Sequence, residues 1–200
     1  DGEISAVSFA YTGLHMDDLL GAFRNLGKSE DVLEFREATR GMIATSFNFV
    51  ASDSAGDIYY SAYQGTPCRG YLPRDEEGEW VEGAHPALLL DGSRYKAFEI
   101  PTKDGVVDES FQDDPYRCVS PFDEIPQRFS PESGYVLTAN NDPVGVSFEG
   151  SLASGPWYIG GAWDVGFRAD TIDRYLAKYI AEERATIETM AELPANVGSP

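Results

Sequence analysis

The sequence predicts an α+β fold of mostly antiparallel strands with flanking helices. Short segments of alternating apolar and polar residues, separated by turn residues, indicate strands. Apolar residues at helical spacing follow the first of these segments and recur near the C-terminal end. The resulting order is one strand, two helices, two strands, a long irregular excursion, a further strand and a helix, which is typical of α+β proteins.

The N-terminal segment, residues 3–11, alternates with Val7, Phe9 and Tyr11 on its more apolar side. This pattern predicts a strand with one buried face, and Gly13 should end it.

Two helices are expected next, because apolar residues recur at helical spacing in residues 19–26 and 32–35. Gly27 separates the two runs. Ser29, which acidic residues follow, is a suitable N-cap for the second helix.

Residues 47–62 have the pattern of a β-hairpin, in which two alternating segments flank a Ser-Ala-Gly-Asp turn. Residues 70–128 are instead rich in proline, glycine and acidic residues, so we expect a loop-rich excursion with one small extra hairpin at most. Both parts should belong to a single domain over residues 1–200, a length that fits one ordinary domain.

A strand over residues 135–139 is expected to lead into Asn140 and Asn141, where Asn-Asn-Asp-Pro indicates a turn. On residue type alone, the asparagines only build that turn. The alternative is that one side-chain amide points at a reacting oxygen. A long helix should begin near Phe167, and Thr186 is a candidate cap for a second helical segment.

Composition excludes several classes of partner and mechanism. The formal net charge of −19 disfavours binding to nucleic acid or to an anionic membrane. No run of about 18 apolar residues is present, so no membrane span is expected. His15 and His85 are the only histidines, and neither accompanies a nucleophile motif, which disfavours a histidine-dependent hydrolase.

Cys68 and Cys118 are the only cysteines, too few for a four-ligand zinc site. Two readings remain open at this point. The two thiols form a disulfide that closes a loop of about fifty residues, which implies an oxidising compartment, or they are both free and buried.

Several short motifs occur together in one order. These are AVSFAYTGL, SFNFVASDSAGDIYYSAYQGTPCRG, SPFDEIPQRFSPESGYVLTANNDPVG and GFRADTIDRYLA. Their order and rough spacing resemble those of the penicillin amidase family of N-terminal-nucleophile hydrolases, over most of the chain except about residues 74–115. Tyr11 replaces the tryptophan that usually precedes Thr-Gly-Leu in that family, and Ser130 stands where an asparagine is frequent.

The resemblance implies both a fold and a mechanism. The fold would be part of the four-layer α-β-β-α sandwich. The nucleophile would be the first residue of a mature β chain, usually serine, with its own α-amine as the base. Asn140 matches the first asparagine of the family's pair, which donates to the oxyanion, and Arg168 matches the arginine that supports the nucleophile's amine. No cofactor is implied for residues 1–200. Some members bind calcium through ligands that lie mainly outside the matching parts, so calcium stays open as a ligand of the full-length parent.

Asp1 stands where a serine, threonine or cysteine nucleophile is needed. We therefore expect residues 1–200 to be an internal fragment of the β chain, inactive alone, whose partners are the remainder of the β chain, the α chain and a small-molecule amide. The parent would be a periplasmic or secreted acylase that cleaves linear amides of the penicillin, cephalosporin or acyl-homoserine-lactone type. The alternative is a catalytically inactive, acidic binding module derived from such an acylase.

Overall fold

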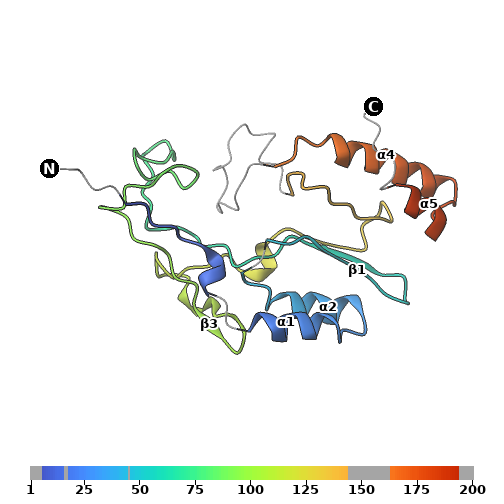
Figure 1. Cartoon of the computed structure of the whole chain (residues 1–200), viewed down its shortest axis with the longest axis horizontal. Helices are drawn as coiled ribbons and strands as arrows, with labels where there is room; N and C mark the ends of the chain where they lie inside the picture. Colours follow the sequence, from blue (N-terminus) through green and yellow to red (C-terminus); the bar gives the residue numbers. More distant parts are fainter. Residues whose placement is uncertain (1–5, 16–17, 45, 144–162, 194–200) are drawn as a thin grey trace.

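The α+β class is confirmed. A computed structural model describes residues 6–15, 18–44, 46–143 and 163–193, and these contain both helices and antiparallel sheets (Figure 1). The helices are α1 (Leu19–Leu26), α2 (Val32–Thr39), α4 (Phe167–Ala181) and α5 (Ile187–Glu192). The strands are β1 (Phe49–Ser52), β2 (Ile58–Ser61), β3 (Thr102–Lys103), β4 (Val106–Val107) and β5 (Gln127–Phe129).

Helices α1 and α2 follow one another with Gly27 as the cap between them, as the sequence predicts. The N-cap of α2 is Asp31 and not Ser29. One carboxylate oxygen of Asp31 accepts hydrogen bonds from the backbone N–H groups of Leu33, at 2.9 Å, and Glu34, at 2.8 Å. Ser29 instead donates back to the carbonyl of Asn25 at 3.1 Å, so its hydroxyl serves the end of α1.

The predicted hairpin is present as β1 and β2, which pair antiparallel with Phe49 opposite Ser61. Its turn is organised by Asp53, whose side chain accepts hydrogen bonds from the backbone of Ala55 and Asp57. Gly56 has a φ of 92°, a left-handed conformation that glycine adopts without strain.

A third strand, β5, completes the sheet in the order β1-β2-β5, with Tyr59 opposite Phe129. Figure 1 shows α1 and α2 along one side of this sheet. On that side Phe49 packs with Ala22 and Met42, and Phe35 meets the ring of Tyr59 edge-on. The sheet and the first two helices therefore share one core.

Two predicted strands are wrong. Residues 6–11 form no strand, and Val7 and Phe9 are 77% and 79% exposed; residues 3–5 of that prediction lie outside the described residues. Residues 135–139 also form no strand. Residues 6–11 do alternate, and residues 135–139 are strand-forming by residue type, but within the described residues no strand lies beside either segment to complete a ladder.

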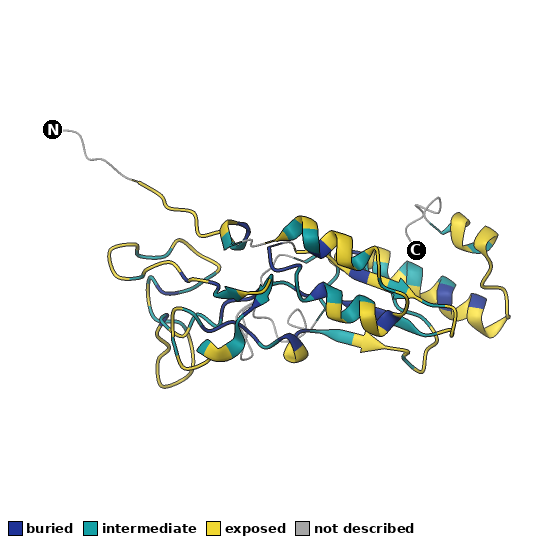
Figure 2. Ribbon diagram, turned by 90° about the horizontal axis from the view of Figure 1, so that it is seen from below, coloured by how far each residue is buried: buried dark blue, intermediate teal, exposed yellow. Residues whose placement is uncertain are grey.

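Residues 70–128 are mostly irregular but contain a core of their own. The small hairpin is β3 with β4, where Thr102 lies opposite Val107. A buried cluster joins four residues of the excursion to Ile43, which lies between α2 and β1; the four are Phe98, Ile100, Val107 and Val119. In Figure 2 dark blue buried segments run through this region between exposed loops.

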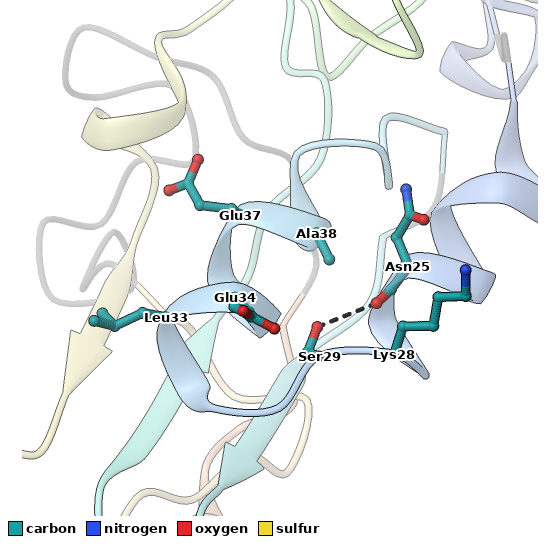
Figure 3. A pocket seen from close by; sticks show the side chains of 7 residues that line it. All are labelled: Asn25, Lys28, Ser29, Leu33, Glu34, Glu37 and Ala38. Carbon is teal, nitrogen blue, oxygen red and sulfur yellow. Dashed lines mark hydrogen bonds between the residues drawn. The ribbon is translucent and has the colours of Figure 1, made fainter.

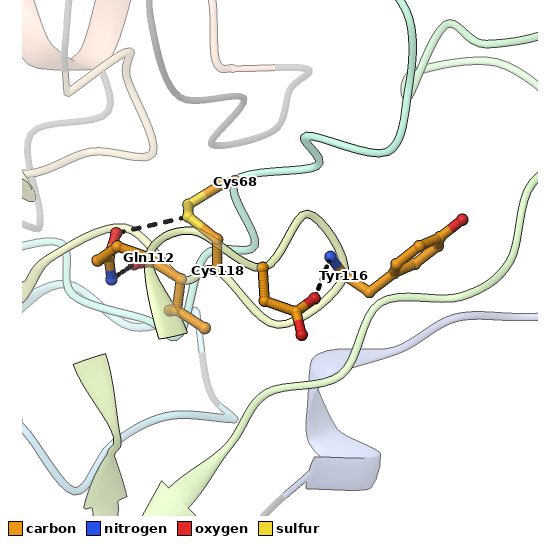
Figure 4. Close-up of a disulfide and its surroundings, with 6 residues drawn as sticks. Cys68, Gln112, Tyr116 and Cys118 are labelled. Atoms are coloured by element: carbon orange, nitrogen blue, oxygen red, sulfur yellow. Dashed lines mark hydrogen bonds between the residues drawn. A yellow bond between two sulfur atoms is a disulfide. The ribbon is translucent and has the colours of Figure 1, made fainter. Parts of the chain in front are cut away.

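The base of the excursion is closed by a disulfide between Cys68 and Cys118, 50 positions apart in the sequence (Figure 4). Backbone hydrogen bonds flank it, from the N–H of Cys68 to the carbonyl of Cys118 at 3.0 Å and from Ser120 to Thr66 at 2.8 Å. Of the two readings that the sequence left open, the structure therefore contains the disulfide.

The C-terminal helices agree with the sequence. Helix α4 begins at Phe167, and Thr186 caps α5. The hydroxyl of Thr189 accepts from the N–H of Thr186 at 2.9 Å, while the hydroxyl of Thr186 accepts from the N–H of Thr189 at 3.3 Å. Figure 1 shows α4 and α5 on the opposite side of the β1–β2–β5 sheet from α1 and α2.

Candidate functional site

Asn140 and Arg168 lie together although 28 positions separate them in the sequence. Nη2 of Arg168 donates a hydrogen bond to Oδ1 of Asn140 at 2.9 Å. The same nitrogen donates to the backbone carbonyl of Ala139 at 2.9 Å. The structure thus brings together the two residues that the sequence singles out.

The backbone around Asn140 is held in an uncommon conformation. Asn140 has a φ of 61°, in the left-handed region where asparagine is among the few non-glycine residues enriched. Ala139 before it is 6% exposed and anchors the turn, and its N–H donates to Oδ1 of Asn141 at 3.1 Å. Asn141 therefore serves the turn, as expected, and Asn140 projects from it as an exposed residue.

Arg168 reaches Asn140 from the first turn of α4. The N-cap of the helix is Gly166, which has a φ of 88° and no side chain to cap the helix. A cation is electrostatically unfavourable at this end of a helix. Asp164, four positions earlier, offsets that cost with a carboxylate oxygen 3.1 Å from Nη2 of Arg168.

This ion pair contributes little to stability, because the Arg168 side chain is 59% exposed. The sequence leaves open that Arg168 only forms a surface salt bridge at a helix start. The structure contains such a salt bridge, and the same guanidinium also binds Asn140, so the bridge does not account for all of its contacts.

The contact with Arg168 fixes the orientation of the Asn140 amide. A guanidinium only donates hydrogen bonds, so the amide oxygen must face it and the NH₂ group must face away. Within the described residues Nδ2 of Asn140 has no acceptor. Among the described residues the amide therefore keeps both of its N–H donors without an acceptor, as a group must in order to receive a developing oxygen anion.

The segment that leads to Asn140 is held against α4 by a second contact. The hydroxyl of Tyr135 donates to a carboxylate oxygen of Asp173 at 2.6 Å. This hydrogen bond holds the pKa of the Tyr135 phenol above its usual value, because the neutral phenol is the donor. Tyr135 and Arg168 thus connect residues 135–140 to the same helix at two points.

Asp164 is the site residue that the sequence reasoning missed. Besides its ion pair, its N–H donates to the carbonyl of Asn140 at 2.8 Å, and its carboxylate accepts from the N–H of Gly166 at 3.2 Å. The one signal in the sequence is its spacing of four positions from Arg168, which suits an ion pair. Acidic residues are too frequent in this chain for that spacing to stand out.

The disulfide is a structural feature. Figure 4 shows Gln112 beside it, with Oε1 3.4 Å from the sulfur of Cys118. A disulfide sulfur has no proton to donate, so this is a polar contact and not a hydrogen bond. Gln112 is held by its amide group, which donates to the carbonyl of Val119 at 3.0 Å.

A hollow lies between α1 and α2 (Figure 3). Its lining residues are Asn25, Lys28, Ser29, Leu33, Glu34, Glu37 and Ala38. All come from these two helices and the loop between them, so the hollow does not include Asn140 or Arg168.

Within the described part of the chain, no group of three or more histidine, cysteine, aspartate or glutamate side chains is arranged to hold a metal ion. Of the helices described, none has the length and apolar character to cross a membrane.

An α+β fold that presents an arginine-oriented amide can stabilise an oxygen anion, which is a requirement of amide hydrolysis. Comparison with protein families agrees: the model of the penicillin amidase family matches residues 2–200. The chain belongs to this family, whose members are hydrolases of the acylase type with small-molecule substrates. No curated protein matches the chain.

Proposed function

We propose that this chain supplies the oxyanion-binding part of an acylase that hydrolyses linear amides of the penicillin, cephalosporin or acyl-homoserine-lactone type. The observation that carries the proposal is the hydrogen bond from Arg168 to Oδ1 of Asn140. It leaves the NH₂ group of a side-chain amide exposed, and the family membership supports an amide as the substrate.

The nucleophile in this proposal is an N-terminal serine of the mature β chain, which these 200 residues do not supply. The serine hydroxyl attacks the amide carbonyl, and the α-amine of the same serine takes the hydroxyl proton. The carbonyl oxygen becomes an anion and receives a hydrogen bond from Nδ2 of Asn140.

Collapse of this intermediate breaks the carbon–nitrogen bond. The leaving amine takes the proton from the α-ammonium group, and an acyl-serine ester remains. Water then attacks the ester by the same route, with the α-amine again as base, and releases the carboxylic acid. Asn140 stabilises the oxyanion in both halves of the reaction.

Arg168 has a second role in this account. Nη2 of its guanidinium is engaged with Ala139, Asn140 and Asp164. The other N–H donors of the group have no acceptor among the described residues. A positive charge close to the nucleophile's amine lowers the pKa of that amine. Since an α-amine has a pKa of about 8, a lower value favours the free base near neutral pH.

The remainder of the β chain and an α chain would complete the site, and the protein would be periplasmic or secreted. The Cys68–Cys118 disulfide supports export, because disulfides persist in oxidising compartments.

The test is expression of the full-length gene product, followed by intact mass and N-terminal sequencing. The purified product is then incubated with a penicillin, a cephalosporin and an acyl-homoserine lactone, and the released acid and amine are measured by mass spectrometry. We expect a β chain that begins with serine and releases the acid from at least one of these substrates. A single unprocessed chain that releases none of them would support the inactive binding module instead.

A further inference from the structure

Asp164 contacts three separate parts of the candidate site. Its N–H donates to the backbone carbonyl of Asn140 at 2.8 Å. Oδ2 lies 3.1 Å from Nη2 of Arg168, and Oδ1 accepts from the N–H of Gly166 at 3.2 Å. Asp164 therefore joins the turn that carries Asn140, the side chain of Arg168 and the N-cap residue of α4.

The hydrogen bond from Asp164 to the carbonyl of Asn140 is part of a backbone pairing of the kind found in β-sheets. Residue 164 forms an isolated parallel β-bridge with Asn141, the residue next to Asn140. The bridge fixes the distance between the turn and the start of α4 independently of any side chain. The carboxylate of Asp164 then lies on the same side as the guanidinium of Arg168.

Arg168 needs such a partner to remain in place. Its Nη2 carries two N–H bonds and faces three acceptors, namely the carbonyl of Ala139, Oδ1 of Asn140 and Oδ2 of Asp164. Asp164 is the one charged acceptor of the three, so its 3.1 Å contact adds a charge–charge attraction that the two bonds at 2.9 Å lack. A long, half-exposed arginine otherwise has many rotamers available, and each charged partner restricts them.

We propose that Asp164 is a positioning residue for the acylase reaction, which acts through Arg168 and the backbone of Asn140 to aim the Asn140 amide at the oxyanion. This proposal rests on the function proposed above. Asp164 does not itself contact the reacting atoms in this account. Its carboxylate holds Arg168, Arg168 holds Oδ1 of Asn140, and the free NH₂ group points away from both.

The variant that tests this is Asp164→Asn in the full-length gene product. It keeps the size of the side chain and an oxygen that can accept from Gly166, and it removes the charge that holds Arg168. We expect kcat to fall about 10- to 100-fold, because a small misplacement of a catalytic group has an effect of this size. The KM should change less than about twofold, since binding of the substrate does not depend on the oxyanion contact.

The chain contains a matched control on the same helix. Asp170 pairs with Arg174 at 2.9 Å with the same spacing of four positions, and both side chains are exposed. Neither residue contacts Asn140 or Arg168 within the described residues. Asp170→Asn therefore removes an equivalent surface ion pair and should leave both kcat and KM unchanged.

A double variant separates positioning from a general loss of structure. If Asp164 acts through the Asn140 amide, then Asp164→Asn should lower kcat little further in an Asn140→Ala background. A merely structural role predicts the same fold reduction in both backgrounds. If Asp164→Asn does not fold, as judged by its thermal midpoint, Asp164→Ser takes its place, since it keeps an oxygen for Gly166.

The outcomes distinguish this proposal from the proposed function. An active wild type with an Asp164→Asn variant as active as Asp170→Asn would overturn the positioning role alone. An equal reduction by Asp164→Asn with and without the Asn140 amide would overturn it as well. A correctly processed wild type that hydrolyses no amide would overturn the proposed function, and the role of Asp164 with it.

Discussion

Nη2 of Arg168 lies 2.9 Å from Oδ1 of Asn140, and this contact determines which end of the amide is free. Because arginine cannot accept a hydrogen bond, the oxygen is engaged and the NH₂ group is presented. A chain turn in the left-handed region at Asn140 and the first turn of α4 at Arg168 create this geometry. The two residues therefore form one functional unit.

The contribution of Arg168 to kcat should depend on the planar shape of its guanidinium as well as on its positive charge. Arg168→Lys keeps a positive charge but replaces a planar fork by a point charge, so it should hold the Asn140 amide poorly. We expect kcat to fall about tenfold or more while the pH dependence of kcat/KM stays as in the wild type.

Arg168→Ala should differ from the lysine variant in its pH profile. Loss of the positive charge raises the pKa of the nucleophile's amine, so the free base is lost at a higher pH. The acidic limb of kcat/KM should therefore move to higher pH in the alanine variant alone. Equal acidic limbs for both variants would contradict an electrostatic role of Arg168.

The disulfide should stabilise the excursion through the size of the loop that it closes. For a sequence separation of 50, loss of the link between Cys68 and Cys118 should lower the free energy of unfolding by about 4 kcal/mol on the chain-entropy account. The measurement is urea unfolding of the Cys68→Ser/Cys118→Ser variant against the oxidised wild type. A difference below about 1 kcal/mol would show that the backbone ladder and the apolar cluster close the excursion without it.

Asp114 should make part of the stability depend on pH. The side chain of Arg117 donates to its carboxylate at 2.8 Å and the backbone N–H of Tyr116 donates at 3.0 Å, and these contacts hold the pKa of Asp114 below its usual value. Its contribution is therefore present above the unfolded pKa of about 3.9 and is lost as pH falls through the lower folded pKa.

Asp114→Asn should accordingly unfold more easily than the wild type near pH 6, and the difference should shrink below about pH 4. Thermal unfolding across this pH range measures both. Asp113→Asn is the control, because that exposed carboxylate makes no hydrogen bond among the described residues. A difference between Asp114→Asn and wild type that is constant with pH would contradict the assignment.

Among the apolar residues between α2 and the end of the excursion, Phe122 should lose the most stability when it is truncated to alanine. It is 1% exposed, and the guanidinium groups of Arg40 and Arg36 lie 3.9 and 4.7 Å from the centre of its ring. Phe122→Ala should lower the free energy of unfolding by about 3–5 kcal/mol, measured by chemical denaturation. Phe129→Ala, at a half-exposed position of β5, should have a much smaller effect.

The sequence predicts the elements that local residue patterns define. Its predictions fail for strands that depend on a partner strand elsewhere in the chain. The β1–β2 hairpin and α4 depend on local patterns, and both are present. Residues 6–11 alternate and residues 135–139 are strand-forming by residue type, but neither pattern specifies a neighbouring strand. Neither segment forms a ladder within the described residues. Strand β5 was missed because Gln-Arg-Phe has no such pattern.

The residues of the candidate site also differ in whether the sequence predicts them. Asn140 and Arg168 were found through motifs that resemble those of a family, and their contact could not be derived from composition or spacing. Asp164 was not found, because acidic residues are frequent in this chain, and its backbone N–H to the carbonyl of Asn140 is a contact that residue type does not reveal.

The most direct test of the account is the activity of Asn140→Asp in the full-length gene product. Aspartate has the same shape, tolerates the left-handed conformation and accepts a hydrogen bond from Arg168, but it has no N–H to offer the oxyanion. We predict a loss of about 100- to 1,000-fold in kcat, with KM and thermal midpoint close to those of the wild type. A variant that retains the wild-type kcat would contradict the assignment of Asn140 as the oxyanion donor.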